Sequence, residues 1–266
     1  MQYDVVMHEL GNWQSPMLRE LFSPQPALRP FIKDYCALTQ EWACSSSEQW
    51  YILPDNSAYL IFYLAGKKGT LTPSLRLIGP RSRHLIINRH HRYFTFIVSF
   101  RPGGLAPFIN TALADLCDNA IDACELLPWV DEVLISRLAS ASQQANLCKF
   151  ITILEEALLY SMPAAVRINP TIQEFTRLIS RFPSRVADIS DQLGITERHL
   201  RTLSQKHIGQ SPKSALQIER FTRSLIISNH AREWASIAHE SGYYDQSHMI
   251  AEYQKMTGKS PEKLFG

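Results

Sequence analysis

The sequence of 266 residues lacks any long hydrophobic run. No apolar stretch reaches the roughly 18 residues that a helix needs to cross a membrane, and the N-terminus lacks the basic and then apolar pattern of a secretory signal. These absences argue against a membrane partner, and we expect a cytoplasmic protein. Hydrophobic residues make up 45% of the chain and charged residues 20%, which is typical of a globular protein. The length predicts two domains, each able to bury a core.

Cysteine pairs are missing as well. The five cysteines are an odd number and no Cys-x-x-Cys occurs, so neither a disulfide framework nor a structural zinc site is expected. Free thiols in a reducing compartment are the expected state. A redox pair of Cys117 and Cys124 is an alternative that the sequence does not favour.

Signatures of catalysis are also absent. No Gly-x-Ser-x-Gly anchors a Ser-His-Asp arrangement. His84, His90 and His91 lie near strand-like segments, but no His-x-His pair with a matching glutamate accompanies them, and the neighbouring arginines would repel a cation. We therefore predict that the chain is not an enzyme and holds no metal or cofactor.

A strong net charge is absent too, but the charge is unevenly distributed. Residues 167–266 hold 14 Lys and Arg against 10 Asp and Glu, whereas residues 1–166 hold 13 against 15. A positive excess on one half suits a nucleic-acid partner. Because this excess is small, a monomer should bind weakly at physiological salt. A homodimer would supply the missing affinity through avidity.

A short phrase occurs twice in the last quarter of the chain, 49 positions apart. The residues of the first copy that recur in the second are His199, Gln205, Lys206, Gly209, Ser211 and Pro212, matched by His248, Gln254, Lys255, Gly258, Ser260 and Pro261. A glycine, Gly194 or Gly242, precedes each copy, and before it lies a short amphipathic segment. Short helix, glycine turn and longer helix are the parts of a helix-turn-helix, which the repeat predicts twice.

The first copy contains the signals that end one helix and start another. Gly194 suits the left-handed position after a helix over 186–193, and Thr196 suits the N-cap of a helix over 197–207. Leu200 and Leu203 should face inward. The opposite face carries Arg198, Arg201, Thr202 and Gln205. Arginine pairs with guanine and glutamine with adenine, so this face suits base edges.

The second copy repeats the pattern with less charge. Asp245 is the expected N-cap of a helix over 246–257. The inward residues are Met249, Tyr253 and Met256, and the outward ones are Gln246, Ser247, Ile250, Ala251 and Gln254. We expect this face to add less base discrimination. Between the copies, a helix over 212–228 would span roughly 25 Å and could hold two recognition helices about 34 Å apart on one face of DNA. The alternative is a pair of helical hairpins with solvated polar faces.

The two copies of the repeat resemble those of a known family. GYYDQSHMIAEYQKMTGKSP (242–261) and ITERHLRTLSQKHIGQSPKS (195–214) resemble the two-copy DNA-binding domain of AraC-type transcription regulators. The resemblance implies that both longer helices enter successive major grooves. The base-facing positions that it implies are Arg198, Arg201, Thr202, Gln246, Ser247, His248 and Ala251. His248 has an equal alternative, a local hydrogen bond.

The sequence departs from the family pattern at two kinds of position. Ser204 stands where an aromatic residue is common, which predicts looser packing of the first unit. Thr202 and Ala251 stand where an arginine is common. The target DNA sequence therefore should not be inferred from relatives.

The first half of the chain is rich in strand-like runs. They cover 50–54, 58–65, 75–79, 84–88 and 93–100, and turn residues separate them. Such spacing predicts an antiparallel barrel or sandwich, followed by helices near 111–116, 123–139 and 143–160. The fold class is then α+β, with an N-terminal domain over 1–162, a linker over 163–169 and a helical DNA-binding domain over 170–266. LPDNSAYLIFYL, LIGPRSR and FIVSFRPGGLAPF resemble the cupin-like effector domain of one AraC-type branch.

The residues of this half leave the effector site open. The candidates for an apolar pocket are Trp42, Trp50, Tyr51, Tyr59, Phe62, Tyr63 and Phe96, which would otherwise be core. The basic cluster 81–92 suits an anionic effector or is a solvated edge, and the phrase FRPGG (100–104) is interpreted as a turn in which Gly103 and Gly104 allow positive φ.

Together these features predict a sequence-specific DNA-binding transcription regulator of AraC type. The expected partners are double-stranded DNA, a small-molecule effector bound in the N-terminal domain, a second copy of the chain, and RNA polymerase as a further candidate. The first alternative is a ligand-independent adaptor that acts through protein contacts, which a filled barrel interior would favour. The second is an enzyme with a DNA-binding tail, which a metal at His84, His90 or His91 would support.

Overall fold

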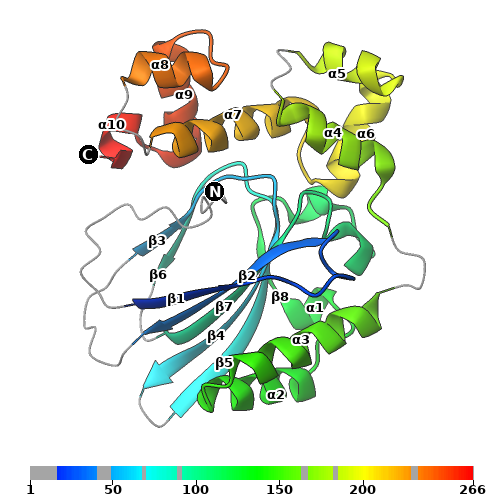
Figure 1. The fold of residues 1–266 in the computed structure, drawn as a ribbon, viewed down its shortest axis with the longest axis vertical. Coiled ribbons are helices and arrows are strands. Elements are labelled where there is room, and N and C mark those ends of the chain that lie inside the picture. The colour runs from blue at the N-terminus through cyan, green and yellow to red at the C-terminus, as the bar shows by residue number, and fades with distance from the viewer. Residues whose placement is uncertain are drawn as a thin grey trace.

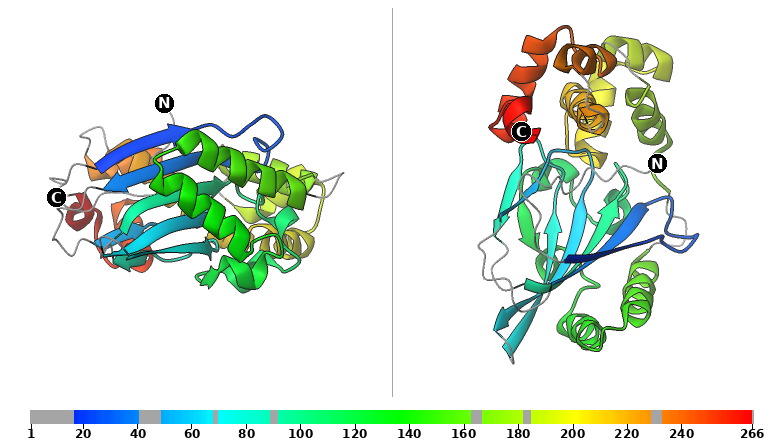
Figure 2. Two further views of the ribbon diagram at one scale, coloured as in Figure 1. Left: turned by 90° about the horizontal axis from the view of Figure 1, so that it is seen from below. Right: turned by 60° about the vertical axis from the view of Figure 1, so that its left-hand side comes forward.

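The computed structural model describes residues 17–40, 49–67, 70–88, 92–162, 167–181, 185–228 and 233–265. Strands come first along the chain and helices follow, so the predicted α+β class is confirmed. In space, a sheet occupies the middle of the molecule, two long helices cover one of its faces, and the C-terminal helices lie beyond one end of its strands (Figure 1; Figure 2).

The sheet is antiparallel, as predicted. Its strands are β1 (Met17–Phe22), β2 (Ile32–Gln40), β4 (Tyr59–Lys67), β5 (Thr70–Ile78), β7 (Arg92–Phe100) and β8 (Ala120–Asp122). They are arranged in the order β1-β2-β7-β4-β5-β8, while β3 (Gln49–Ile52) and β6 (Leu85–Asn88) form a separate pair. All five predicted runs contain a strand; β1, β2 and β8 were not predicted. The cupin-like comparison remains a prediction.

The helices that follow β7 differ most from the prediction between residues 123 and 139. They are η1 (Ala106–Phe108), η2 (Leu113–Leu116), α1 (Ala123–Leu126), α2 (Glu132–Gln143) and α3 (Leu147–Ser161). The single helix predicted over 123–139 is wrong, because the chain leaves the helix at Leu127. Leu127 precedes Pro128, which disfavours helical backbone at the residue before it. Asp131 then starts α2 by accepting a hydrogen bond from the Leu134 amide at 2.7 Å.

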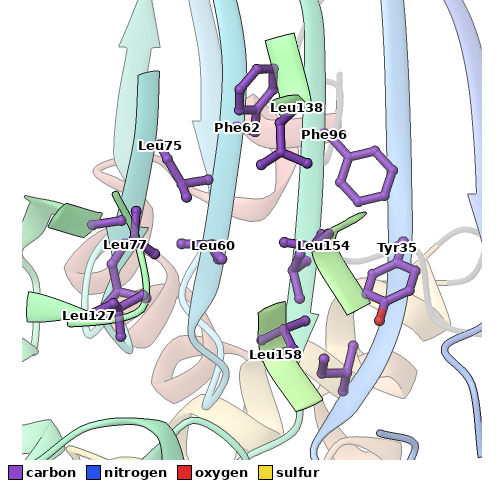
Figure 3. Packing of buried hydrophobic residues seen from close by; sticks show 14 of the residues in the cluster. Tyr35, Leu60, Phe62, Leu75, Leu77, Phe96, Leu127, Leu138, Leu154 and Leu158 are labelled. Carbon is purple, nitrogen blue, oxygen red and sulfur yellow. The ribbon is translucent and has the colours of Figure 1, made fainter. Parts of the chain in front are cut away.

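One face of the sheet is filled by α3. The ring of Phe150 lies 4.6 Å from that of Phe96, 5.2 Å from that of Phe62 and 5.4 Å from that of Phe94, measured between centroids. Leu154 and Leu158 pack beside Leu60 in the same cluster (Figure 3). Phe62 and Phe96, two candidates for a ligand pocket, are therefore core residues.

The other pocket candidates are divided. Tyr59 is buried in a second cluster on the other side of the sheet, with Ile61 and Ile97, and Tyr63 packs against it. Trp42 and the side chains of Trp50 and Tyr51 lie outside the described residues. The FRPGG turn is confirmed, since Gly103 has φ +79°, but Gly104 does not have the positive φ that was predicted for it.

The C-terminal helices follow the predicted order. They are α4 (Pro170–Ile179), α5 (Val186–Leu193), α6 (Glu197–His207), α7 (Pro212–Ser228), α8 (Trp234–Glu240), α9 (Gln246–Thr257) and α10 (Pro261–Phe265). Helix α7 belongs to two cores: Ala215 and Leu216 pack with α4, α5 and α6, whereas Ile218, Phe221 and Leu225 pack with α8, α9 and α10. The predicted pair of helix-turn-helix units joined by a long helix is confirmed.

Loops of the sheet contact both units. Leu53 is buried in the second helical core, and the Asn56 side-chain amide donates to the Ala215 carbonyl of α7 at 3.0 Å. The His84 amide donates to the Met256 carbonyl at the end of α9, at 2.8 Å. Beyond the end of α6, the Gln210 amide nitrogen lies 3.1 Å from Cys117 Sγ. These contacts hold the helical part against the sheet.

Candidate DNA-binding surface

The first unit is built around its glycine turn. Gly194 has φ +64° and ψ +30°, which is the left-handed conformation that ends α5. The Ile195 amide closes the turn by donating to the Ser190 carbonyl at 3.1 Å. Thr196 Oγ1 then caps α6 by accepting from the His199 amide at 3.2 Å. Both sequence predictions for this turn are confirmed.

Ser204 is the position where the family commonly has an aromatic residue. Its side chain has 0% exposure, and its hydroxyl donates to the Gln210 carbonyl at 2.7 Å. The chain turns back here through Gly209, which has φ +83°. A hydroxyl at this buried position satisfies a carbonyl that would otherwise lose its partner. The buried serine therefore contributes a hydrogen bond at this position.

The outward face of α6 is solvent-exposed, as the repeat predicts. The exposed residues are Arg198, Arg201, Thr202 and Gln205. Thr202 Oγ1 donates to the Arg198 carbonyl one turn earlier, at 3.1 Å, and this bond fixes its rotamer. The structure places the four side chains on one helix, free of the two cores.

A cationic groove adjoins this face. It encloses about 680 Å³ and is lined by Arg185, Val186, Ala187, Glu197, Arg198, Arg201, Ser211, Pro212 and Lys213. These residues come from the beginnings of α5, α6 and α7, where unpaired backbone amides give each helix a positive end. Four cationic side chains face one carboxylate, so the groove suits an anion such as a phosphate. Arg185 and Lys213 were not predicted as site residues.

The second unit repeats the turn with different residues. Gly242 has φ +81°, and the Tyr243 amide donates to the Ala238 carbonyl at 2.9 Å. Asp245 caps α9 by accepting from the His248 amide at 2.7 Å. The predicted inward residues Met249, Tyr253 and Met256 are all buried.

The outward side of α9 is poorer in charge than that of α6. Ser247 and Ala251 are exposed, whereas Gln246 and His248 are half-buried. Tyr244, which sequence analysis did not single out, is 93% exposed just before the helix. An aromatic residue so exposed beside a recognition helix is a further candidate for DNA contact.

His248 has local partners. Its Nε2 lies 3.4 Å from Glu252 Oε1, and its ring meets the Tyr243 ring edge to face at 5.5 Å. These contacts agree with the local alternative. Contact between His248 and a base remains a prediction, as does every base contact named above.

Other candidate sites receive little support among the described residues. Burial raises the pKa of the Cys117 thiol to about 11, with the charge of Asp118 adding to the effect, so little reactive thiolate forms. His84 binds the helical part, and His90 and His91 lie outside the described residues. No group of three metal-binding side chains occurs in the described ranges. None of the described helices has both the length and the hydrophobicity needed to cross a bilayer.

Comparisons with known proteins agree with this geometry. Residues 189–266 match the model of a helix-turn-helix domain, and residues 20–122 match a domain of unknown function (DUF6597). The C-terminal part of the chain is accordingly a helix-turn-helix domain of the AraC type. This places the chain in the class of DNA-binding regulators.

Solved structures with a similar course of the chain include two of ToxT from Vibrio cholerae. ToxT from strain O395 is 12% identical, with a TM-score of 0.45 over 94% of this chain and 97% of that one. Wild-type ToxT from strain SCE256 with a bound unsaturated fatty acid is 10% identical, with a TM-score of 0.45 over 96% of both chains. No curated protein matches the sequence.

Proposed function

We propose that the protein is a sequence-specific transcription regulator whose two helix-turn-helix units contact successive major grooves on one side of a duplex. The observation that carries this proposal is the exposed polar face of α6 beside a groove lined by Arg185, Arg198, Arg201 and Lys213. Helix α7 joins the two units, which lie at its opposite ends (Figure 1).

The first unit would supply most of the discrimination. Arg198 and Arg201 have the donor geometry for guanine, and Gln205 has that for adenine, while Thr202 can bond to either kind of base. Arg185 and Lys213 would hold phosphates, which position a protein on DNA without reading its sequence. In the second unit, Gln246, Ser247 and His248 offer hydrogen bonds, and the Ala251 methyl group suits the methyl group of thymine.

The organisation that we propose has three parts. Residues 1–162 form a regulatory and dimerisation domain, residues 163–169 a linker, and residues 170–266 the DNA-binding domain. A cytoplasmic homodimer would place four helix-turn-helix units on DNA, two from each copy. The DNA-bound dimer would then contact RNA polymerase. Catalysis has no part in this proposal.

Control by a small molecule bound in the N-terminal domain is one way in which the regulator would respond to a signal. A ligand changes an equilibrium only if it binds two states with different affinity. The loops that contact α7 and α9 would provide such states, since an effector that moves them would reposition the units.

The second candidate is regulation without a small molecule. The observation that favours it is the packing of Phe150 against Phe62, Phe94 and Phe96, which fills the face of the sheet where a ligand pocket was predicted. Protein contacts would then carry the signal. Binding of the protein to DNA with and without a metabolite mixture distinguishes the two: an unchanged site and affinity favour the second candidate.

Selection from random duplexes with the full chain tests the proposed contacts. Each copy of wild type should select two half-sites spaced by about one duplex turn. Arg198→Ala and Arg201→Ala should each relax preference in one half-site by about 1–3 kcal/mol. Arg137→Ala is the matched control, because Arg137 is an exposed arginine of α2 beyond the far side of the sheet. If wild type and both α6 variants select the same sequences with the same preference, α6 does not read the major groove as proposed.

A further inference from the structure

A carboxylate lies beneath the second recognition helix. Glu252 belongs to α9, yet its residue is only 5% exposed. Its Oε1 accepts from the Gln217 side-chain amide at 2.9 Å and lies 3.8 Å from Arg220 Nη2, both on α7. The same oxygen lies 3.4 Å from His248 Nε2, one turn earlier on α9. One buried oxygen thus links the recognition helix to α7 and to a residue proposed to face DNA.

Arg220 extends this link to the glycine turn. Its guanidinium carbon lies 5.9 Å from the centre of the Tyr243 ring. A Cβ added at Gly242 would lie 3.7 Å from Arg220 Cδ, so the arginine runs alongside the turn. Tyr243 in turn packs edge to face with His248. Burial and, after it, the charge of Glu252 raise the pKa of Tyr243, which agrees with a carboxylate close to this ring.

The first unit has no counterpart of this arrangement at the repeated positions. By the offset of 49, Leu203 corresponds to Glu252 and His199 to His248. Leu203 packs against the apolar core of its unit, and His199 is exposed. The helix-turn-helix can therefore be built on a leucine at this position. Burying a charge costs desolvation energy, so a buried ion pair is weak evidence for stability. Such a pair can instead fix one packing arrangement of the two helices that it joins.

We propose that Glu252 is a positioning residue that fixes the orientation of α9 and of His248, and thereby sets the base preference of the second unit. This inference rests on the proposed function. Apolar contacts are non-directional, so Met249 and Met256 alone would tolerate a small rotation of α9. The Tyr253 hydroxyl, 2.7 Å from Ser224 Oγ of α7, fixes one point of the helix, and Glu252 fixes a second. Such a rotation would separate Glu252 from Gln217 and Arg220 and leave buried polar groups without partners, which is costly.

The low charge of the outward face explains why orientation matters here. Long arginines on α6 can adjust to a base edge, whereas Ser247 and Ala251 are short and reach a base only if the helix backbone is correctly placed. His248 is longer, but Glu252 and Tyr243 hold its ring. Base preference in the second half-site should therefore depend on a residue that does not itself touch DNA.

The test uses the full chain and duplexes in which one half-site is varied at a time. The double variant Arg220→Met with Glu252→Leu removes both charges together, so neither remains buried without its partner. We expect an unchanged or higher melting temperature, because replacing a buried pair by apolar residues is often neutral or stabilising. Preference in the second half-site should fall about tenfold, the effect of one mismatched base pair, while preference in the first half-site stays at the wild-type value.

Glu252→Gln provides a second, isosteric variant. It keeps an oxygen for Gln217 but loses the charge that pairs with Arg220, so second-site preference should fall by less than in the double variant. A wild-type ratio of second-site to first-site preference in either folded variant overturns the proposal. A uniform loss of binding to all duplexes overturns it as well, because that result indicates a general structural role. If wild type itself selects no sequence, the proposed function fails, and the inference fails with it.

Discussion

Replacement of Glu219 by Gln tests the contact between α7 and the loop that precedes β4. Glu219 is half-buried on α7, and burial first and the charge of Asp55 second raise the pKa of its carboxyl from 4.5 to about 7, against the opposing effect of Arg223. Asn56, next to Asp55, donates to α7 one turn before Glu219. Burial also raises the pKa of Asp55, although Tyr59 and Ser57 donate hydrogen bonds to it.

The direction of the pH effect follows from the raised pKa. The folded chain binds the Glu219 proton more tightly than the unfolded chain, so the contribution to stability is fully present below pH 4.5 and is lost as the pH rises to about 7. At about 1.4 kcal/mol per pH unit, the loss is at most about 3.5 kcal/mol. Solvent that reaches the half-buried side chain makes it smaller.

Urea unfolding at several pH values between 4.5 and 8 measures this loss. The free energy of unfolding of wild type, relative to that of Glu219→Gln, should fall as the pH rises to about 7 and stay nearly constant at higher pH. The variant should be the more stable protein at pH 8, because a neutral amide replaces a carboxylate that is costly to bury. Glu262→Gln is the control, since Glu262 is exposed on α10. Parallel curves for wild type and Glu219→Gln would refute the reasoning.

Three further predictions concern stability and are measured by the same unfolding experiment. Gly194→Ala should cost about 1–2 kcal/mol, because φ is +64° but no atom lies within 4 Å of the added Cβ. Gly209→Ala should cost more, because its Cβ would also lie 2.7 Å from the Leu113 carbonyl oxygen. Equal costs for the two variants would show that the chain at Leu113 moves away without a penalty. Phe150→Ala should cost about 3–5 kcal/mol, and a loss below 1 kcal/mol would mean that the sheet face is not closely packed. Asp245→Ala should cost about 1 kcal/mol through loss of the α9 cap, whereas Asp245→Asn should cost little; equal effects would show that the cap does not depend on the side-chain oxygen.

Local signals in the sequence predicted the C-terminal helices well. The glycine at 194, the N-cap residues Thr196 and Asp245, and the apolar spacing act within one or two turns of the chain, and the observed helices begin and end where these signals stand. The signal that interrupts the helix predicted over 123–139 is also local, because Pro128 disfavours helical backbone at Leu127.

Features that depend on distant segments were not predictable in the same way. Strand β7 pairs with β2 on one side and β4 on the other, and no short-range signal specifies such partners. The groove beside α6 arises where three helices begin close together, so only the fold brings Arg185 and Lys213 to its lining. Glu252 looks like a solvated residue in the sequence, and only the packing of α9 on α7 buries it.

The contacts of His84 and Cys117 give the two units separate connections to the sheet. The loop with His84 contacts the end of α9 at Met256, and Cys117 contacts the segment after α6 at Gln210. A displacement of the His84 loop therefore reaches α9 directly. A displacement at Cys117 acts on the segment between α6 and α7, because Gln210 also accepts a hydrogen bond from Ser214 of α7. Under the proposed function, a signal at the sheet would act on the two half-sites through different contacts, and would weaken one while the other is kept.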